Sequence, residues 1–310
     1  MEMLRKAAED KYWKAYFTNP QTTREEIKRA QRLFSVKGRY EPLIRMGQGG
    51  SGVVHAIQEK KSGKLRALKI QKEESTDALS IANEKKILGD LRNFESVAHL
   101  AREKSSGNLE PFMIMDFLEG VAISELKGET ARRENRKETF QLLNKIAQIY
   151  AKLVEEYGVL HRDVKPGNLI FDRFGNVYVI DFGIAIKEAT IGKLETSSGT
   201  VKYMPRERLM VQEHRRSDIY SLAVMFFELV EGVHPLAAQT EETVADAEPL
   251  LNSVVEFHMK GEFQKTIERS ASMPDKFKEL LIKMAEKNVQ QRPEYQEVEE
   301  RMRSIALEID

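Results

Sequence analysis

Apolar and polar positions follow two different periods along the chain. Before about residue 118, short apolar runs rich in β-branched residues lie between glycine-containing turns, while later apolar positions recur mainly at helical spacing. Strands are therefore predicted at 40–46, 53–57, 65–70 and 111–115. Helices are predicted at 77–91, 134–157, 275–287 and 293–307. Between residues 239 and 262 the chain is polar and acidic, and we expect a loop and a helix whose carboxylates form either a solvated face or a site for basic substrates.

A predicted hairpin near the middle of the chain brings three polar side chains together. Two short apolar runs flank Asp172–Asn176, a segment rich in the residues that turns favour. Asp163 and Asn168 precede the first strand and Asp181 follows the second, so the hairpin returns all three to one place. The carboxylate of Asp181 and the amide oxygen of Asn168 suit a hard divalent cation such as Mg²⁺.

Two further residues at this place have charges that suit phosphoryl transfer. Asp163 is a candidate base, and Lys165 offers a cation for anionic oxygens. The transition state of phosphoryl transfer is stabilised mainly by position and charge. Either His161–Asp163 or Asp181–Gly183 alone can occur by chance, but both in order around one hairpin make chance a poor explanation.

The sequences His161–Asn168 and Asp181–Gly183 resemble the catalytic loop and the metal-binding segment of eukaryotic-type (Hanks-type) protein kinases. Lys165, two residues after Asp163, resembles the serine/threonine branch. The resemblance covers about residues 40–305. It implies an α+β, two-lobed fold in which a small antiparallel sheet with one helix (39–118) precedes a mostly helical lobe (119–310).

The same resemblance implies an activity and a cofactor. The γ-phosphoryl group of ATP would pass to serine or threonine hydroxyls of proteins, with Mg²⁺ held by Asn168 and Asp181. Asp163 would orient the substrate hydroxyl and accept its proton, and Lys165 would neutralise charge on the γ-phosphate. The domain would also phosphorylate its own activation segment.

A glycine-rich turn between the first two predicted strands is the expected phosphate-binding element. Glycines at 47, 49 and 52 are weak evidence alone, because dinucleotide-binding folds share this spacing. A helix would follow in those folds, whereas Val53–Ile57 favours a strand. By resemblance the ATP site comprises Met46, Gly47, Gln48, Gly49, Gly50, Ser51, Gly52, Val54, Ala67, Lys69, Met115, Asp116, Leu118 and Ile170. Backbone groups of Asp116 and Leu118 would bond adenine.

Lys69 lies inside an apolar predicted strand, where a lysine is rarely buried without a partner. The resemblance assigns Lys69 to the α- and β-phosphates and pairs it with Glu84 in the following helix. Lys69 is alternatively an edge lysine that extends into solvent. Glu84 is alternatively a surface residue that pairs with Lys85 or Lys86.

Residues 183–207 would form the activation segment. Its candidate phosphorylation sites are Thr196, Ser197 and Ser198, which are alternatively only polar loop residues. Arg162 offers a cation that could pair with such a phosphate and order the segment. The hydroxyl of Thr200 would bridge Asp163 and Lys165.

The end of this segment departs from the family pattern. The family usually has Ala-Pro-Glu there, whereas this chain has Pro205-Arg206-Glu207. Glu207 is retained, and Arg292 matches its usual ion-pair partner. Asp218 would bond the backbone of the catalytic loop. The shifted proline puts the expected path of the loop and the shape of the substrate pocket in doubt, but it does not alter the residues expected to carry out phosphoryl transfer.

Residues 1–38 lie outside the resemblance. Apolar residues at helical spacing predict a helix over 3–17, which Asn19-Pro20 should end. Thr23 and Glu26 form a capping box that predicts a second helix. These helices either pack on the main domain or bind a partner and regulate it.

Composition excludes several classes of protein. Lysine plus arginine and aspartate plus glutamate number 49 each, so no net charge attracts nucleic acid or an anionic membrane. The absence of cysteine excludes disulfides and thiolate metal sites and is compatible with a reducing compartment such as the cytoplasm. No apolar run approaches the ~20 residues of a membrane span, and no secretory signal is evident.

The main alternative is a pseudokinase that binds nucleotide and acts as a scaffold without turnover. The presence of Lys69, Glu84, Asp163, Asn168 and Asp181 argues against it, and only Pro205-Arg206 favours it. A kinase acting on small molecules is a weaker alternative, because residues 199–207 resemble a segment that docks peptides.

Overall fold

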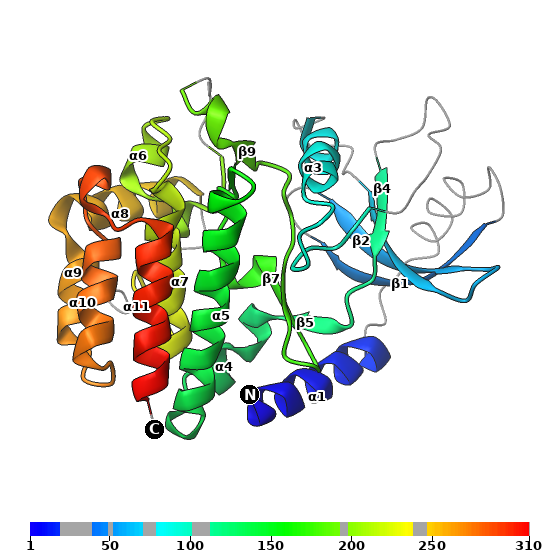
Figure 1. Cartoon of the computed structure of the whole chain (residues 1–310), viewed down its shortest axis with the longest axis horizontal. Helices are drawn as coiled ribbons and strands as arrows, with labels where there is room; N and C mark the ends of the chain where they lie inside the picture. The colour runs from blue at the N-terminus through cyan, green and yellow to red at the C-terminus, as the bar shows by residue number, and fades with distance from the viewer. Residues whose placement is uncertain are drawn as a thin grey trace.

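The computed structural model describes residues 1–18, 39–48, 52–70, 79–100, 112–192, 198–237 and 247–309. An antiparallel sheet with one helix lies beside a larger, mostly helical part (Figure 1). The α+β fold that the resemblance implies is therefore confirmed.

The first part is a four-stranded antiparallel sheet in the order β1-β2-β3-β4. Its strands are β1 (Tyr40–Gln48), β2 (Val53–Glu59), β3 (Leu65–Ile70) and β4 (Phe112–Asp116). Side chains alternate between the two faces of a strand. Along β3, Leu68 and Ile70 join a small apolar cluster on one face, which leaves Ala67 and Lys69 on the other. Helix α3 (Leu79–Asp90) packs beside β4.

The second part begins with short strands that shape the site. β5 (Gly120–Ala122), β7 (Leu169–Asp172) and β8 (Val177–Val179) form one antiparallel sheet, and β6 (Val159–Leu160) pairs with β9 (Ile186–Lys187). The predicted hairpin is therefore β7–β8. In its turn, the Asp172 carboxylate accepts hydrogen bonds from the N–H groups of Phe174 and Asn176 at 2.9 and 2.8 Å, which explains the turn.

Helices make up the rest of this part. They are α4 (Lys127–Thr130), α5 (Arg136–Glu155), α6 (Arg206–Leu209), α7 (Ser217–Glu231), α8 (Ala247–Lys260), α9 (Glu262–Arg269), α10 (Asp275–Met284) and α11 (Tyr295–Glu308). Short 3-10 turns lie at 123–126, 133–135, 166–168, 188–190, 201–203 and 289–291.

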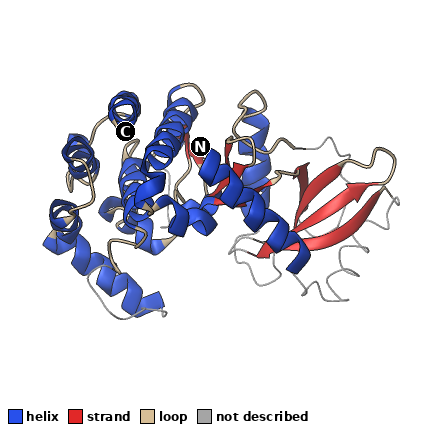
Figure 2. Cartoon of the chain, turned by 90° about the horizontal axis from the view of Figure 1, so that it is seen from below, coloured by secondary structure: helices blue, strands red, loops and turns tan. Residues whose placement is uncertain are grey.

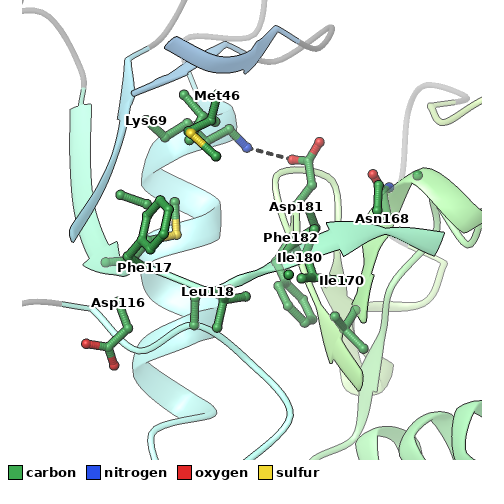
Figure 3. Close-up of a pocket in the computed structure, with 18 of the residues that line it drawn as sticks. Met46, Lys69, Asp116, Phe117, Leu118, Asn168, Ile170, Ile180, Asp181 and Phe182 are labelled. Carbon is green, nitrogen blue, oxygen red and sulfur yellow. Dashed lines mark hydrogen bonds and ion pairs between the residues drawn. The ribbon is translucent and has the colours of Figure 1, made fainter. Parts of the chain in front are cut away.

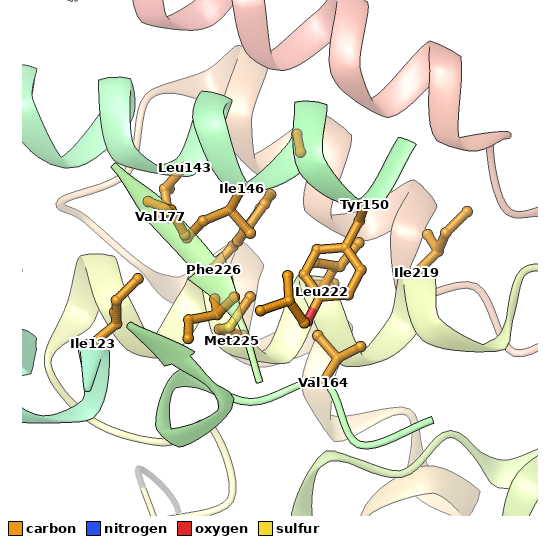
Figure 4. Packing of buried hydrophobic residues seen from close by; sticks show 14 of the residues in the cluster. Ile123, Leu143, Ile146, Tyr150, Val164, Val177, Ile219, Leu222, Met225 and Phe226 are labelled. Atoms are coloured by element: carbon orange, nitrogen blue, oxygen red, sulfur yellow. The ribbon is translucent and has the colours of Figure 1, made fainter. Parts of the chain in front are cut away.

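Helix α7 is the centre of the core. Apolar on almost all sides, it is buried over nearly its whole length, as such a helix must be. Side chains of α5 and of the catalytic loop pack on it, among them Ile146, Tyr150 and Val164 (Figure 4). Helix α7 ends at Glu231 and is capped by Gly232, whose positive φ of 76° lets its N–H bond the Glu228 carbonyl.

Some helix boundaries differ from the sequence prediction. Helix α5 begins at Arg136 and not at 134, because residues 133–135 form a 3-10 turn. Helix α10 ends at Met284 and not at 287, because the side chain of Asn288 caps the next 3-10 turn. Of the polar stretch at 239–262, residues 247–260 form α8 and residues 239–246 lie outside the described residues.

Helix α1 (Glu2–Thr18) lies across the two parts of the molecule, beneath β5 and β7 (Figures 1 and 2). Leu4 and Ala8 are buried in the main core. The carboxylate of Glu138 on α5 accepts the N–H groups of Met3 and Leu4 at 3.0 and 2.8 Å and thereby caps the helix. The first predicted helix thus packs on the domain, and the second lies outside the described residues.

Within the described segments, no helix is both long and apolar enough to cross a membrane.

Candidate active site

A cavity of about 570 Å³ lies between the sheet and the β7–β8 hairpin (Figure 3). Apolar side chains from opposite sides enclose it, with Val54 and Ala67 on the sheet and Ile170 on β7. Twelve residues expected from the sequence line it: Met46, Gly52, Val54, Ala67, Lys69, Glu84, Met115, Asp116, Leu118, Asn168, Ile170 and Asp181. An apolar cleft with few polar groups suits a planar base.

Part of the expected glycine turn is outside the described residues. Gly49, Gly50 and Ser51 fall there. Gly47 and Gln48 end β1, where they pair with Val54 and Val53 across the hairpin. At Gly52 a Cβ atom would lie 2.5 Å from the Ile70 carbonyl oxygen, so this position accepts only glycine without a shift of backbone.

Lys69 joins two carboxylates at one side of the cavity. Its Nζ lies 2.7 Å from Glu84 Oε2. It also lies 2.7 Å from Asp181 Oδ1, as the dashed line in Figure 3 shows. Lys69 and Glu84 are buried, which excludes the alternatives of an edge lysine and a surface glutamate. Burial alone would lower the pKa of Lys69, but the neighbouring carboxylates raise it above the ordinary value. The lysine is therefore a fixed cation.

Asn168 and Asp181 face the same space from the two ends of the hairpin (Figure 3). The amide nitrogen of Asn168 donates to Asp163 Oδ2 and to the Asp163 carbonyl, both at 2.8 Å, which leaves its oxygen for another partner. Burial would raise the pKa of Asp181, but Lys69 lowers it, so this carboxylate is ionised at neutral pH. Among the described residues no group of three acidic, histidine or cysteine side chains could hold a metal alone. Two oxygen ligands suit Mg²⁺ that is also bound by phosphates.

Asp163 is surrounded by donors. Its Oδ2 accepts from Lys165 Nζ at 2.7 Å, and its Oδ1 accepts from the Thr200 N–H at 2.8 Å. The Thr200 hydroxyl lies 2.6 Å from Lys165 Nζ. Thr200 thus contacts both residues, but it reaches Asp163 through its backbone. Burial would raise the pKa of Asp163, and Lys165 with the other donors lowers it below the ordinary value.

The catalytic loop is held from below by Asp218 at the start of α7. Its carboxylate accepts the His161 N–H at 2.8 Å and the Arg162 N–H at 3.1 Å, as expected. Arg162 and Asp181 have positive φ values of 68° and 65°. Such conformations cost about 1–3 kcal/mol each and persist where surrounding contacts fix them. Asp218 supplies such contacts at Arg162.

The connection after β4 lines the cavity with backbone. The Asp116 side chain turns away from the cavity (Figure 3) and forms an ion pair with Arg66. The Asp116 N–H donates to the His99 carbonyl at 2.9 Å, and the Leu118 carbonyl accepts from the Gly120 N–H at 3.0 Å. The backbone groups still suited to a base are therefore the Asp116 carbonyl and the Leu118 N–H.

Comparison with known proteins agrees with this geometry. The family model described as protein kinase domain matches residues 40–302. The chain belongs to this family. It is 24% identical over 284 residues to a probable serine/threonine-protein kinase, PknB, of Lactococcus lactis, with 86% of this chain and 42% of that protein covered. It is 29% identical over 217 residues to mitogen-activated protein kinase kinase 2 of Arabidopsis thaliana, with 68% and 59% covered.

A third similar protein is the serine/threonine-protein kinase PrkC of Bacillus subtilis, which is 24% identical over 267 residues. The match covers 82% of this chain and 38% of that protein. The kinase domain thus spans about half the length of the curated relatives it matches.

Several residues that line the kinase cavity were not predicted. They are Leu88, Ala98, Phe117, Gly120, Val121, Ala122, Glu125, Gly167, Val179, Ile180 and Phe182. Helical spacing could have indicated Leu88, one turn after Glu84 on α3. The apolar residues of β5 carry no comparable signal, because their position depends on pairing with β7.

Asn83 was also missed, although it precedes Glu84 directly. Its amide nitrogen donates to three carbonyl oxygens, those of Phe182, Gly183 and Ala185, at 3.3, 3.0 and 2.9 Å. Glu84 Oε1 accepts the Phe182 N–H at 3.2 Å. Adjacent residues of α3 therefore hold the backbone that carries Asp181.

The ion pair expected at the end of the activation segment is present. Arg292 donates to both oxygens of Glu207 at 2.6 and 3.0 Å, and both side chains are buried. Pro205 precedes α6 and its carbonyl accepts the Arg208 N–H at 3.1 Å, so the altered sequence still starts a helix there. Of the candidate phosphorylation sites, Ser198 is described, and Thr196 and Ser197 lie outside the described residues.

Arg162 does not have the partner that the sequence analysis expected. Its Nε lies 2.8 Å from Glu213 Oε2, and both side chains are almost fully buried. The expectation that Arg162 offers a cation to a phosphorylated loop residue stays a prediction, and in this arrangement a carboxylate inside the domain already pairs with Arg162.

Proposed function

We propose that this domain transfers the γ-phosphoryl group of ATP to serine or threonine hydroxyls of proteins, with Mg²⁺ as cofactor. One observation carries the proposal: Asp163, bonded to Lys165 and Thr200, lies next to a cavity in which Lys69 joins Glu84 and Asp181. The names of the similar proteins support serine and threonine as acceptors.

The cavity and Lys69 would bind the nucleotide. Adenine would lie between the apolar side chains of the sheet and Ile170, and the Lys69 ammonium would contact the α- and β-phosphates. Asn168 and Asp181 would hold Mg²⁺. When bound, that ion neutralises charge on the phosphate oxygens as it develops.

Asp163 would bind and orient the acceptor hydroxyl. Its lowered pKa keeps it ionised at neutral pH, so it accepts a hydrogen bond from the hydroxyl and takes its proton as the new oxygen–phosphorus bond forms. The oxygen–phosphorus bond to ADP breaks in the same step. Lys165, 2.7 Å from Asp163, would neutralise charge on the transferred group.

Protein substrates would dock along residues 199–207, which follow the catalytic centre. Thr200 links this segment to Asp163, and the Glu207–Arg292 ion pair fixes its end. We further propose the cytoplasm as the compartment, since a chain without cysteine fits reducing conditions.

The test is transfer from labelled ATP with Mg²⁺ to the chain itself and to a generic basic protein, with phosphoamino acids mapped by mass spectrometry. We expect phosphoserine or phosphothreonine, and Asp163→Asn should lower kcat by about 10³-fold because the base is lost. Asp90→Asn, the same change on a carboxylate that is 44% exposed, should leave kcat unchanged.

The scaffold alternative makes the opposite prediction. Nucleotide would bind to the wild-type chain, but no phosphate would be transferred above the level of Asp163→Asn. Equal kcat in wild type and Asp163→Asn with measurable transfer would instead show that the base is a different residue.

A further inference from the structure

A second cluster of charges lies under the catalytic loop. Glu213 Oε2 accepts from Arg162 Nε at 2.8 Å and from Arg208 Nε at 3.0 Å, and Glu213 Oε1 accepts from Arg208 at 2.8 Å. Arg208 also donates to Asp218 at 2.8 Å. All four side chains are at most 5% exposed. The cluster thus contains two guanidinium groups and two carboxylates, and its charge is balanced.

This cluster reaches the start of the activation segment through Arg162. The second donor group of Arg162, Nη1, bonds the Ile184 carbonyl at 3.1 Å, directly after Gly183 and before β9. Arg208 Nη1 bonds the Arg162 carbonyl at 2.8 Å. Glu213 therefore orients Arg162, and Arg162 fixes both the catalytic loop and the segment that leaves Asp181.

The backbone just before Glu213, which places the Glu213 side chain in the cluster, is strained. Val211, two residues earlier, has a positive φ of 57°, which is an outlier for a β-branched residue. The Gln212 N–H donates to the Glu207 carbonyl at 2.8 Å and stabilises the turn. Strained backbone of this kind persists where the free energy of other contacts outweighs the cost of the strain. The ion pairs of Glu213 are such contacts.

We propose that Glu213 is a positioning residue. Its carboxylate binds and orients Arg162, a role that a phosphorylated residue of the activation segment would otherwise have. The domain then orders its catalytic loop without phosphate on Thr196, Ser197 or Ser198. This inference rests on the proposed kinase function. A phosphate near Arg162 would meet a guanidinium whose charge a buried carboxylate already balances, so phosphorylation would gain little from it.

The experiment compares kcat and the KM for ATP before and after treatment with a protein phosphatase, for the wild type and for Glu213→Gln. The triple variant Thr196→Ala/Ser197→Ala/Ser198→Ala is a third sample. We expect phosphatase treatment and the triple variant to leave wild-type kcat within about threefold. Glu213→Gln should lower kcat by about 100-fold, because small displacements of catalytic groups have effects of this size.

The KM for ATP should change less than about threefold in Glu213→Gln, because Glu213 does not line the nucleotide cavity. A merely structural defect would lower the fraction of active enzyme, which also reduces the apparent kcat and leaves the KM unchanged, so burst titration of active sites is used to obtain kcat per active site. Glu138→Gln, which removes a carboxylate that caps the distant helix α1, is the matched control and should keep kcat.

A loss of more than tenfold in kcat on phosphatase treatment, or in the triple variant, would overturn the inference. These two samples do not touch the buried cluster, so they decide the question even if Glu213→Gln fails to fold. Absence of transfer in the untreated wild type would instead contradict the proposed function itself.

Discussion

Two buried charge clusters flank the catalytic loop, and their composition differs. Beside the nucleotide cavity, the single ammonium of Lys69 lies between the carboxylates of Glu84 and Asp181. Beneath the loop, the guanidinium groups of Arg162 and Arg208 face two carboxylates, those of Glu213 and Asp218. The first cluster has an excess of negative charge and borders a cavity, whereas the second is balanced and enclosed.

The difference indicates what each cluster is for. A buried charge without compensation is costly, so an unbalanced cluster at a cavity is suited to a ligand that supplies the missing positive charge. The Mg²⁺ ion that accompanies a nucleotide supplies such a charge. The balanced cluster needs no ligand, and its role is to fix the geometry of the loop on which Asp163 lies.

Removal of the cation from the unbalanced cluster should have the largest effect on turnover. We expect Lys69→Met to lower kcat by roughly 10³-fold, because a fixed donor to the phosphates is lost. The fold should persist: burial raises the pKa of Glu84, so without Lys69 this carboxyl group can take up a proton. Phosphate transfer and circular dichroism measure the two effects.

The matched control is Lys61→Met, an exposed lysine in the turn between β2 and β3. It should retain wild-type kcat. Wild-type turnover in Lys69→Met would show that the unbalanced cluster does not act on the nucleotide.

Acid should not act first on the carboxylates of Asp181 and Glu213. Burial would raise the pKa values of Asp181 and Glu213, but Lys69 and Arg208 respectively lower them below the ordinary values, so both carboxylates are ionised at neutral pH. Burial lowers the pKa of His234 and of His258 from 6.5 to about 4. The free energy of unfolding should therefore be highest above pH 6.5 and fall between pH 6.5 and 4, where only the unfolded chain takes up these protons.

Each histidine contributes a slope of at most about 1.4 kcal/mol per pH unit in that window. Urea unfolding at pH 7, 6 and 5 measures the slope. The variant His234→Gln/His258→Gln should flatten it. An unchanged slope in this variant would place the acid-sensitive groups elsewhere, including in the two clusters.

A smaller effect is expected at Asn83, which links α3 to the backbone around Asp181. Asn83→Asp keeps the size of the side chain but replaces the donor with a carboxylate that faces carbonyl oxygens. We expect kcat to fall about tenfold, which corresponds to roughly one hydrogen bond, while the KM for ATP changes less than threefold.

Asn93→Asp makes the same chemical change at an exposed position just after α3 and should be neutral. Steady-state kinetics of both variants provide the test. A kcat for Asn83→Asp equal to that of Asn93→Asp would show that the three bonds to the segment do not position Asp181.

The unbalanced cluster was predictable from sequence because each member lies in a distinctive local pattern. Asp181 follows a hairpin, and Lys69 is a charge inside an apolar strand, where only a partner permits it. Strand alternation then places Ala67 and Lys69 on one face of β3. The predicted helix over residues 3–17 likewise follows from apolar spacing, although its contact with β5 and β7 does not.

The balanced cluster was not predictable by the same means. In the sequence, Arg208 and Glu213 look like ordinary solvated charges, and no period or motif marks them. Their burial depends on a turn at Val211 that uses an unfavourable φ, and on the packing of α6 against α7. Such tertiary placement overrides local signals, which is why Glu213 was not predicted as a partner of Arg162.

The most direct test of the central difference between the clusters is calorimetric titration with an ATP analogue that cannot transfer its phosphate, with and without Mg²⁺. The account predicts that Mg²⁺ tightens binding by about tenfold or more in the wild type and has little effect in Asp181→Asn. Equal affinity with and without Mg²⁺ in the wild type would contradict it, because the unbalanced cluster would then have no use for the ion.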